Sequence, residues 1–223
     1  MQLPNSIFNF LQKLAKNNNR EWFNVHKDAF KAEEAHFKVF ANAVLDRMSA
    51  QDNIERLKVF RIYRDVRFSK NKSPYKTHFS ASLTRATKWL RGGYYFHLQP
   101  GGESFVGGGF WGPDAADLKR IRSEIAANAD ELRAILAQPK FIETFGTLEG
   151  DQVKSAPRGY AKDHPAIDLL RYKQYLLVRR FDDKEVFQVD FLDKVVDTFQ
   201  AMRPFFDYMS EVLTTDENGV PID

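Results

Sequence analysis

The chain has 223 residues, of which 43% are hydrophobic and 14% aromatic, so it can bury a full globular core. It has no cysteine, which excludes disulfide frameworks, thiolate zinc sites and cysteine nucleophiles and fits a reducing compartment. The formal net charge is +3, and no stretch offers the roughly 20 apolar residues of a membrane helix, so we expect a cytoplasmic protein without a membrane partner.

Two amphipathic helices are predicted in residues 1–50. The first begins at a capping residue, Asn5 or Ser6, and ends at the three asparagines from residue 17. The second begins near Asn19 and continues for nearly thirty residues, because phenylalanine recurs every seven positions from Phe23 to Phe37. We expect this aromatic stripe to face the core.

Residues 57–111 change to an alternating pattern, which predicts a meander of four antiparallel strands. The first strand is expected at 60–68, with Phe60 and Phe68 on its apolar side. The next three strands are expected at 79–83, 94–99 and 104–110, and Pro-Gly-Gly forms the turn between the last two.

Residues 113–223 are predicted to contain helices and a fifth strand near 173–181. A helical pattern starts at Pro113 and breaks at Pro139, a loop covers 154–165, and an amphipathic helix closes the chain. We therefore predict one α+β domain over residues 1–223. Its central antiparallel meander sheet of about five strands is covered on the apolar face by helices from both termini.

The excess of positive charge is concentrated in the segment that contains the first predicted strands. Residues 56–91 hold eleven Lys or Arg and one acid, so the rest of the chain is net negative. On the first strand Asp65 shares one face with Arg61 and Arg67, where side chains at successive alternate positions stand about 7 Å apart. Surface ion pairs contribute only about 0 to 1 kcal/mol each, and one acid cannot neutralise the segment, so we expect an oxyanion to complement the guanidinium groups.

Arg64 is expected to have a structural role instead. It falls on the apolar side of the first strand, between Ile62 and Val66. Because a buried guanidinium without a partner is costly, we predict that Arg64 meets a carboxylate or backbone carbonyls beneath the sheet.

We predict a pocket over the polar sheet face, bounded by the loop at 69–77, that binds an anionic small molecule such as a phosphorylated or carboxylate metabolite. The residues expected to hold it are Arg61, Tyr63, Arg67, Lys70, Lys72, Tyr75, Lys76, Arg158 and Lys173. The candidates for orienting or transforming it are His78, His97 and Tyr75, since the two histidines lie on the polar sides of strands that can be neighbours. Whether a reaction follows, which cofactor takes part and which oligomer forms stay open.

Two alternatives use the same surface. Interleaved aromatic and basic residues suit nucleic-acid binding, although the nearly neutral overall charge argues against it. Alternatively, acidic residues of this chain or of a protein partner cover the basic face, and the domain is structural. We expect no metal site, because the five histidines form no close pair and cysteine is absent.

Several segments share one resemblance. They are NNNREWF (17–23), RIYRDVRFSKNKSPYKTH (61–78), GGYYFHLQPGG (92–102), GGGFWGP (107–113), PRGYAKDHP (157–165) and LLRYKQY (169–175). In this order they resemble the bacterial and fungal family known as domain of unknown function 2461, over nearly the whole chain. The resemblance implies no activity, substrate or cofactor. That family usually has aspartate where this sequence has Asn71, which argues against a metal-binding or acid role in the loop.

Overall fold

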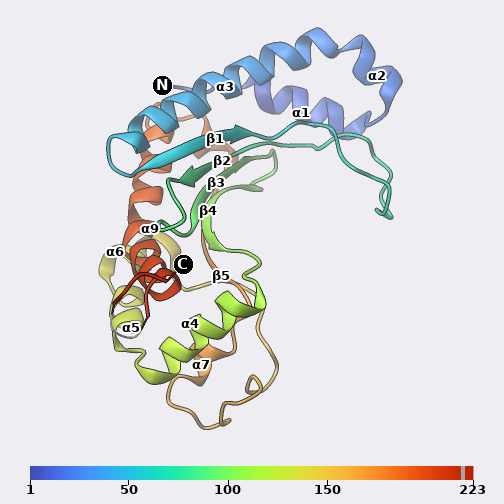
Figure 1. The fold of residues 1–223 in the computed structure, drawn as a ribbon. Coiled ribbons are helices and arrows are strands. Elements are labelled where there is room, and N and C mark those ends of the chain that lie inside the picture. The colour runs from blue at the N-terminus through green and yellow to red at the C-terminus, as the bar shows by residue number, and fades with distance from the viewer. Residues whose placement is uncertain (217–218, 223) are drawn as a thin grey trace. The chain divides into compact units, whose positions relative to one another are not determined.

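Residues 1–216 and 219–222 are described by a computed structural model (Figure 1). The helices are α1 (Ser6–Lys16), α2 (Arg20–Val25), α3 (Lys27–Ser49), α4 (Ala115–Ala127), α5 (Asp130–Leu136), α6 (Pro139–Phe145), α7 (Ile167–Leu170), α8 (Asp183–Val186) and α9 (Phe191–Thr214). The strands are β1 (Ile54–Val59), β2 (Phe79–Arg85), β3 (Gly93–Leu98), β4 (Ser104–Phe110) and β5 (Tyr175–Phe181). They pair in the order β1-β2-β3-β4-β5, which confirms the predicted α+β fold with one antiparallel meander sheet.

The chain forms two compact units. Residues 1–84, 95–106 and 180–197 make up the first, whereas the second has residues 85–94, 107–179 and the described residues from 198 onward. The strands β2 to β5 and the helix α9 each supply residues to both units. The single domain expected from the sequence stays a prediction. Among the described helices, none combines the length and the apolar composition needed to cross a bilayer.

Phenylalanines of α3 pack on the apolar side of the sheet in the first unit. Phe37 stacks on Phe79 of β2 with ring centroids 5.4 Å apart and contacts Phe96 of β3 at 5.5 Å. Phe40 contacts Phe96 at 6.0 Å and stacks on Phe191, the first residue of α9, at 5.6 Å. These rings are all buried, so the predicted aromatic stripe does face the core.

The second predicted helix is divided at His26, which separates α2 from α3. Asn19 caps α2 at the predicted start by accepting a hydrogen bond from the Trp22 backbone N–H at 2.9 Å. The His26 ring stacks on Trp22 with centroids 3.9 Å apart, and its Nδ1 donates to the Trp22 carbonyl at 2.8 Å. The His26 backbone N–H also bonds to the Trp22 carbonyl, and the backbone leaves helical geometry at His26, with φ −103° and ψ 17°.

The strand predicted at 60–68 is wrong in position, because β1 ends at Val59. Residues 60–78 continue instead as a two-stranded ribbon with a bridge between Tyr63 and Tyr75 (Figure 1). The Phe60 ring lies on the polar side of the sheet, 6.0 Å from the ring of Tyr95, and Phe68 at the ribbon tip is exposed. Alternation specifies a buried face only where something covers that face.

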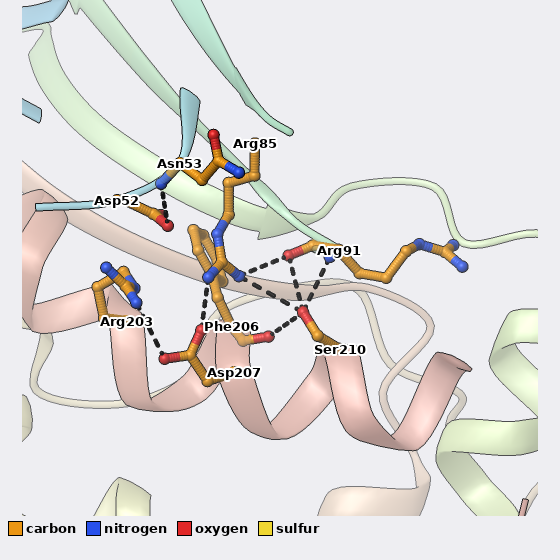
Figure 2. A network of polar contacts seen from close by, with 8 residues as sticks. All are labelled: Asp52, Asn53, Arg85, Arg91, Arg203, Phe206, Asp207 and Ser210. Carbon is orange, nitrogen blue, oxygen red and sulfur yellow. Dashed lines mark hydrogen bonds and ion pairs between the residues drawn. The ribbon is translucent and has the colours of Figure 1, made fainter. Parts of the chain in front are cut away.

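Arg64 does not lie beneath the sheet, which corrects the prediction for this residue. It donates to the Ser73 carbonyl at 3.0 Å and to the Ser69 hydroxyl at 3.3 Å, within its own loop. The buried arginine is Arg85, which is 1% exposed. In the second unit its guanidinium donates to Oδ1 of Asp207 at 2.5 Å and to the Arg91 carbonyl at 3.1 Å (Figure 2).

Glycines of β4 allow a close approach to β5 in the second unit. Gly109 has a φ of +122°, and a Cβ there would lie 2.2 Å from the Tyr175 carbonyl oxygen. The glycine at this position therefore allows the backbones of β4 and β5 to pack closely. The helical run breaks before Pro139 as predicted, since α5 ends at Leu136. Pro139 then begins α6, because proline loses no hydrogen bond at the first helical position.

Candidate functional site

Two histidine rings contact each other on the polar side of the sheet in the first unit. His78 immediately precedes β2 and His97 lies in β3, and their ring centroids are 4.0 Å apart. Each alternates with a phenylalanine of the core, Phe79 or Phe96, so both rings point to the opposite side. The approach expected from their strand positions is present in the structure.

A chain of hydrogen bonds holds His97. The Tyr95 hydroxyl lies 3.1 Å from its Nδ1, and its Nε2 lies 3.0 Å from Oε1 of Gln99. Since a carboxamide oxygen only accepts, Nε2 carries the proton and Nδ1 accepts from Tyr95. The Ser80 side chain bonds to Tyr95, and Gln99 also bonds to His78, so the network runs from β2 across β3.

Both imidazoles are neutral at pH 7. Burial, together with the nearby His97 and Lys76, lowers the pKa of His78 to about 3, and a hydrogen bond with Gln99 opposes the shift. Burial also lowers the pKa of His97, where Gln99 and the carboxylate of Glu103 oppose the shift. The pair therefore offers ring nitrogens as hydrogen-bonding groups rather than as charges.

Three cations form what we call the cationic cluster, Lys58, Arg61 and Lys76. The Nζ atoms of Lys58 and Lys76 lie 5.0 and 5.4 Å from the centroid of the Phe60 ring. Within residues 1–216 and 219–222, none of the three cations forms an ion pair with a carboxylate. Burial lowers the pKa of Lys76, and the like charges of Arg61 and Lys58 lower it further. The cluster thus gathers positive charge beside the histidines, with the charge of Asp65 felt at Arg61 but not in an ion pair with it.

Three other cations predicted for the site, Arg67, Lys70 and Lys72, lie at the ribbon tip. Arg67 forms a two-pronged ion pair with Asp65, with contacts of 2.6 and 3.0 Å, and its hydrogen bonds hold the pKa of that carboxyl below the usual range. Lys72 donates to the carbonyls of Val66 and Arg67, and Lys70 is exposed. These residues are separate from the cationic cluster.

Tyr75, expected to orient or transform a ligand, packs inside the first unit. Its ring stacks on Phe23 with centroids 3.9 Å apart, and the Asn18 side chain bonds to its backbone N–H and carbonyl. Tyr63 pairs with it across the ribbon and is exposed. The aromatic ring of Tyr75 therefore joins the ribbon to the helices.

Arg158 and Lys173 belong to the second unit. Arg158 is exposed on the loop between residues 154 and 165, and Lys173 pairs with Asp151 at 3.8 Å. The second unit also holds two pockets, of about 300 and 830 Å³. The larger is lined by Glu124, Glu131, Glu211 and Asp216 against Lys119 and Arg120, a charge balance that disfavours an anion.

The sequence interpretation missed four residues of the site, namely Lys58, Phe60, Gln99 and Phe105. Lys58 and Phe60 lie two positions apart, as do Lys76 and His78. In an extended segment this spacing places both members of a pair on the same side, and it was the signal that could have identified Lys58 and Phe60. Phe105 of β4 stacks on His97 with centroids 4.9 Å apart. Nothing local to its position identified this contact.

Comparison with known proteins identifies one relationship. A family model described as a conserved hypothetical protein, DUF2461, matches residues 6–208, which confirms the resemblance seen in the sequence. No curated protein and no solved structure matches the chain. Among the described residues, no group of three His, Asp or Glu side chains is placed to hold a metal ion.

Proposed function

The chain belongs to the DUF2461 family of conserved hypothetical proteins, and we propose that it binds a small anionic molecule at its cationic cluster. One observation carries the proposal. Lys76 is partly buried beside Lys58 and Arg61, and none of the three is paired with a carboxylate in the described part of the chain. A bound anion removes the repulsion that lowers the pKa of Lys76.

Phosphate or carboxylate is the chemical group that fits this cluster. The planar fork of Arg61 matches two oxygens of either group, and the two ammonium groups supply further donors. Two unit charges 4 Å apart attract by about 4 kcal/mol at the dielectric constant near a protein surface. The attraction of one oxyanion to three cations therefore exceeds the cost of removing its hydration water more readily than the attraction to an isolated surface lysine does.

The body of the ligand would lie against Phe60 and the histidine pair. Both ring nitrogens of His97 already have partners, so it holds the surrounding network in place. His78, with a pKa of about 3, is a poor general base at neutral pH. The proposal is therefore binding without an assigned reaction.

Isothermal titration calorimetry tests the proposal with inorganic phosphate, sugar phosphates, nucleoside monophosphates and dicarboxylates. Lys76→Met keeps the aliphatic stem but removes the charge, and we expect at least tenfold weaker binding of whichever probe binds the wild type. Lys13→Met is the matched control, because Lys13 is exposed on α1, and it is expected to bind like the wild type. Heat from no member of the panel, or equal affinity for the Lys76→Met variant, would refute the proposal.

A further inference from the structure

The ribbon tip presents an aromatic ring that the described chain leaves uncovered. Phe68 is 96% exposed, the highest value among the large hydrophobic side chains of the described residues. It lies in the loop that joins the two strands of the ribbon, away from α3 and the core phenylalanines. A single exposed apolar residue needs no explanation, so the surroundings of Phe68 decide what its exposure means.

Basic residues are frequent in the ribbon that carries this ring. Residues 60–78 hold six Lys or Arg and one acid, Asp65. Lys70 is exposed and forms no ion pair within residues 1–216 and 219–222. The side chains of Arg67 and Asp65 are 77% and 50% exposed, so water screens their ion pair and a competing phosphate can displace the carboxylate.

Lys72 keeps the tip in one conformation. Its ammonium donates to the carbonyls of Val66 at 3.0 Å and Arg67 at 3.3 Å, which lie on the opposite side of the loop. Asn71 adds a second local bond by accepting from the Ser73 backbone N–H at 2.9 Å. Phe68 and its cations therefore sit on an ordered turn, which lowers the entropy that a partner must remove on binding.

We propose that the ribbon tip binds single-stranded nucleic acid, with Phe68 stacked on an unpaired base and Arg67, Lys70 and Lys72 next to phosphates. An exposed ring flanked by cations matches the two chemical features of every nucleotide, a π-face and a negative backbone. The region is distinct from the cationic cluster, so this inference goes beyond the small-anion site.

Single strands fit better than duplexes. Stacking of the Phe68 ring on a base that is already unpaired strengthens binding at no cost to base pairing. In a duplex the base step must first be opened, and the free energy of unstacking opposes the gain from the ring. A membrane surface is the less favoured partner, because stable anchoring requires a larger apolar face than the one ring at this tip.

Fluorescence anisotropy with a labelled twelve-residue oligothymidine and its ribonucleotide counterpart tests the proposal. Three phosphate contacts predict a slope of about −2 in log affinity against log salt, or roughly 20-fold weaker binding at 200 mM than at 50 mM salt. Phe68→Ala is expected to weaken binding at least fivefold, whereas Phe68→Trp keeps it. Trp111→Ala removes another exposed aromatic residue, 71% exposed and in the second unit, and is expected to leave affinity unchanged.

A second pair of variants checks the charges. Lys70→Gln is expected to reduce the salt slope by about 0.7, and Lys13→Gln to leave it unchanged. Lys76→Met tests independence, because it is expected to abolish small-anion binding while oligonucleotide affinity stays within about twofold of the wild type.

Four outcomes would overturn the inference. They are no binding at 50 mM salt, equal affinity of the wild type and Phe68→Ala, tighter binding of a matched duplex, and a Phe68→Ala effect confined to vesicles of phosphatidylcholine and phosphatidylserine. The last outcome would assign the tip to membranes instead.

Discussion

Gly109→Ala is expected to lower the free energy of unfolding by about 4 kcal/mol. Its φ of +122° is a backbone conformation that side chains other than glycine rarely adopt, and such strain costs about 1 to 3 kcal/mol. The new Cβ would also lie 2.2 Å from the Tyr175 carbonyl oxygen and 3.1 Å from the Cα of Leu176, both in β5. Contacts below 3.0 Å are essentially absent for real Cβ atoms, so the backbone of β5 must move, at a further cost of about 1 to 3 kcal/mol.

Gly146→Ala is the matched control, because it separates backbone strain from the close approach. Gly146 ends α6 with a φ of +69°, and a Cβ there has no atom within 4 Å. Only the conformational cost remains, about 1 kcal/mol. For a chain of this length 1 kcal/mol shifts Tm by about 2 to 4 °C, so we expect a loss of roughly 8 to 16 °C for Gly109→Ala and 2 to 4 °C for Gly146→Ala.

Thermal unfolding followed by circular dichroism measures both variants. Urea titration checks that the change lies in stability rather than in the surface exposed on unfolding. Equal losses in Tm would show that the approach of β4 to β5 is not what requires glycine at position 109.

Two further predictions concern charge. Asp207→Ala is expected to lower the free energy of unfolding by about 2 to 4 kcal/mol, because it removes a carboxylate from the buried guanidinium of Arg85 (Figure 2). Asp168→Ala breaks the exposed pair with Arg133 and is expected to cost at most about 1 kcal/mol, so equal urea midpoints would contradict this account. Between pH 6.5 and 3 the unfolded chain binds a proton at His78 and the folded chain does not. The free energy of unfolding is therefore expected to decrease as the pH is lowered from 6.5 to 3. His78→Gln is expected to flatten that dependence in urea titrations at several pH values, and an unchanged slope would disprove the role of His78.

Much of the candidate site could be predicted because its residues follow a simple rule. On β2 and β3, residues at alternate positions face alternate sides, so His97 opposite Phe96 and His78 opposite Phe79 placed both histidines on one face. The unbalanced positive charge could likewise be read from composition. Beyond the end of β1 the alternation of a regular strand no longer applies. Phe60 and Phe68 were therefore wrongly predicted to face the apolar side of the sheet.

The amino-acid sequence alone determined the elements whose side chains repeat with a period, namely the N-terminal helix, the aromatic stripe of α3, and the strands from β2 to β5. Such patterns are local, since each records which side of one element is buried. Only the tertiary structure decided that Tyr75 stacks on Phe23 and that Arg85 meets Asp207, 122 positions away in the chain. It also decided that Lys58 lies near Arg61 and Lys76 and that Phe68 remains uncovered. Contacts between distant residues depend on the path of the chain between them, and no local period in the sequence encodes that path.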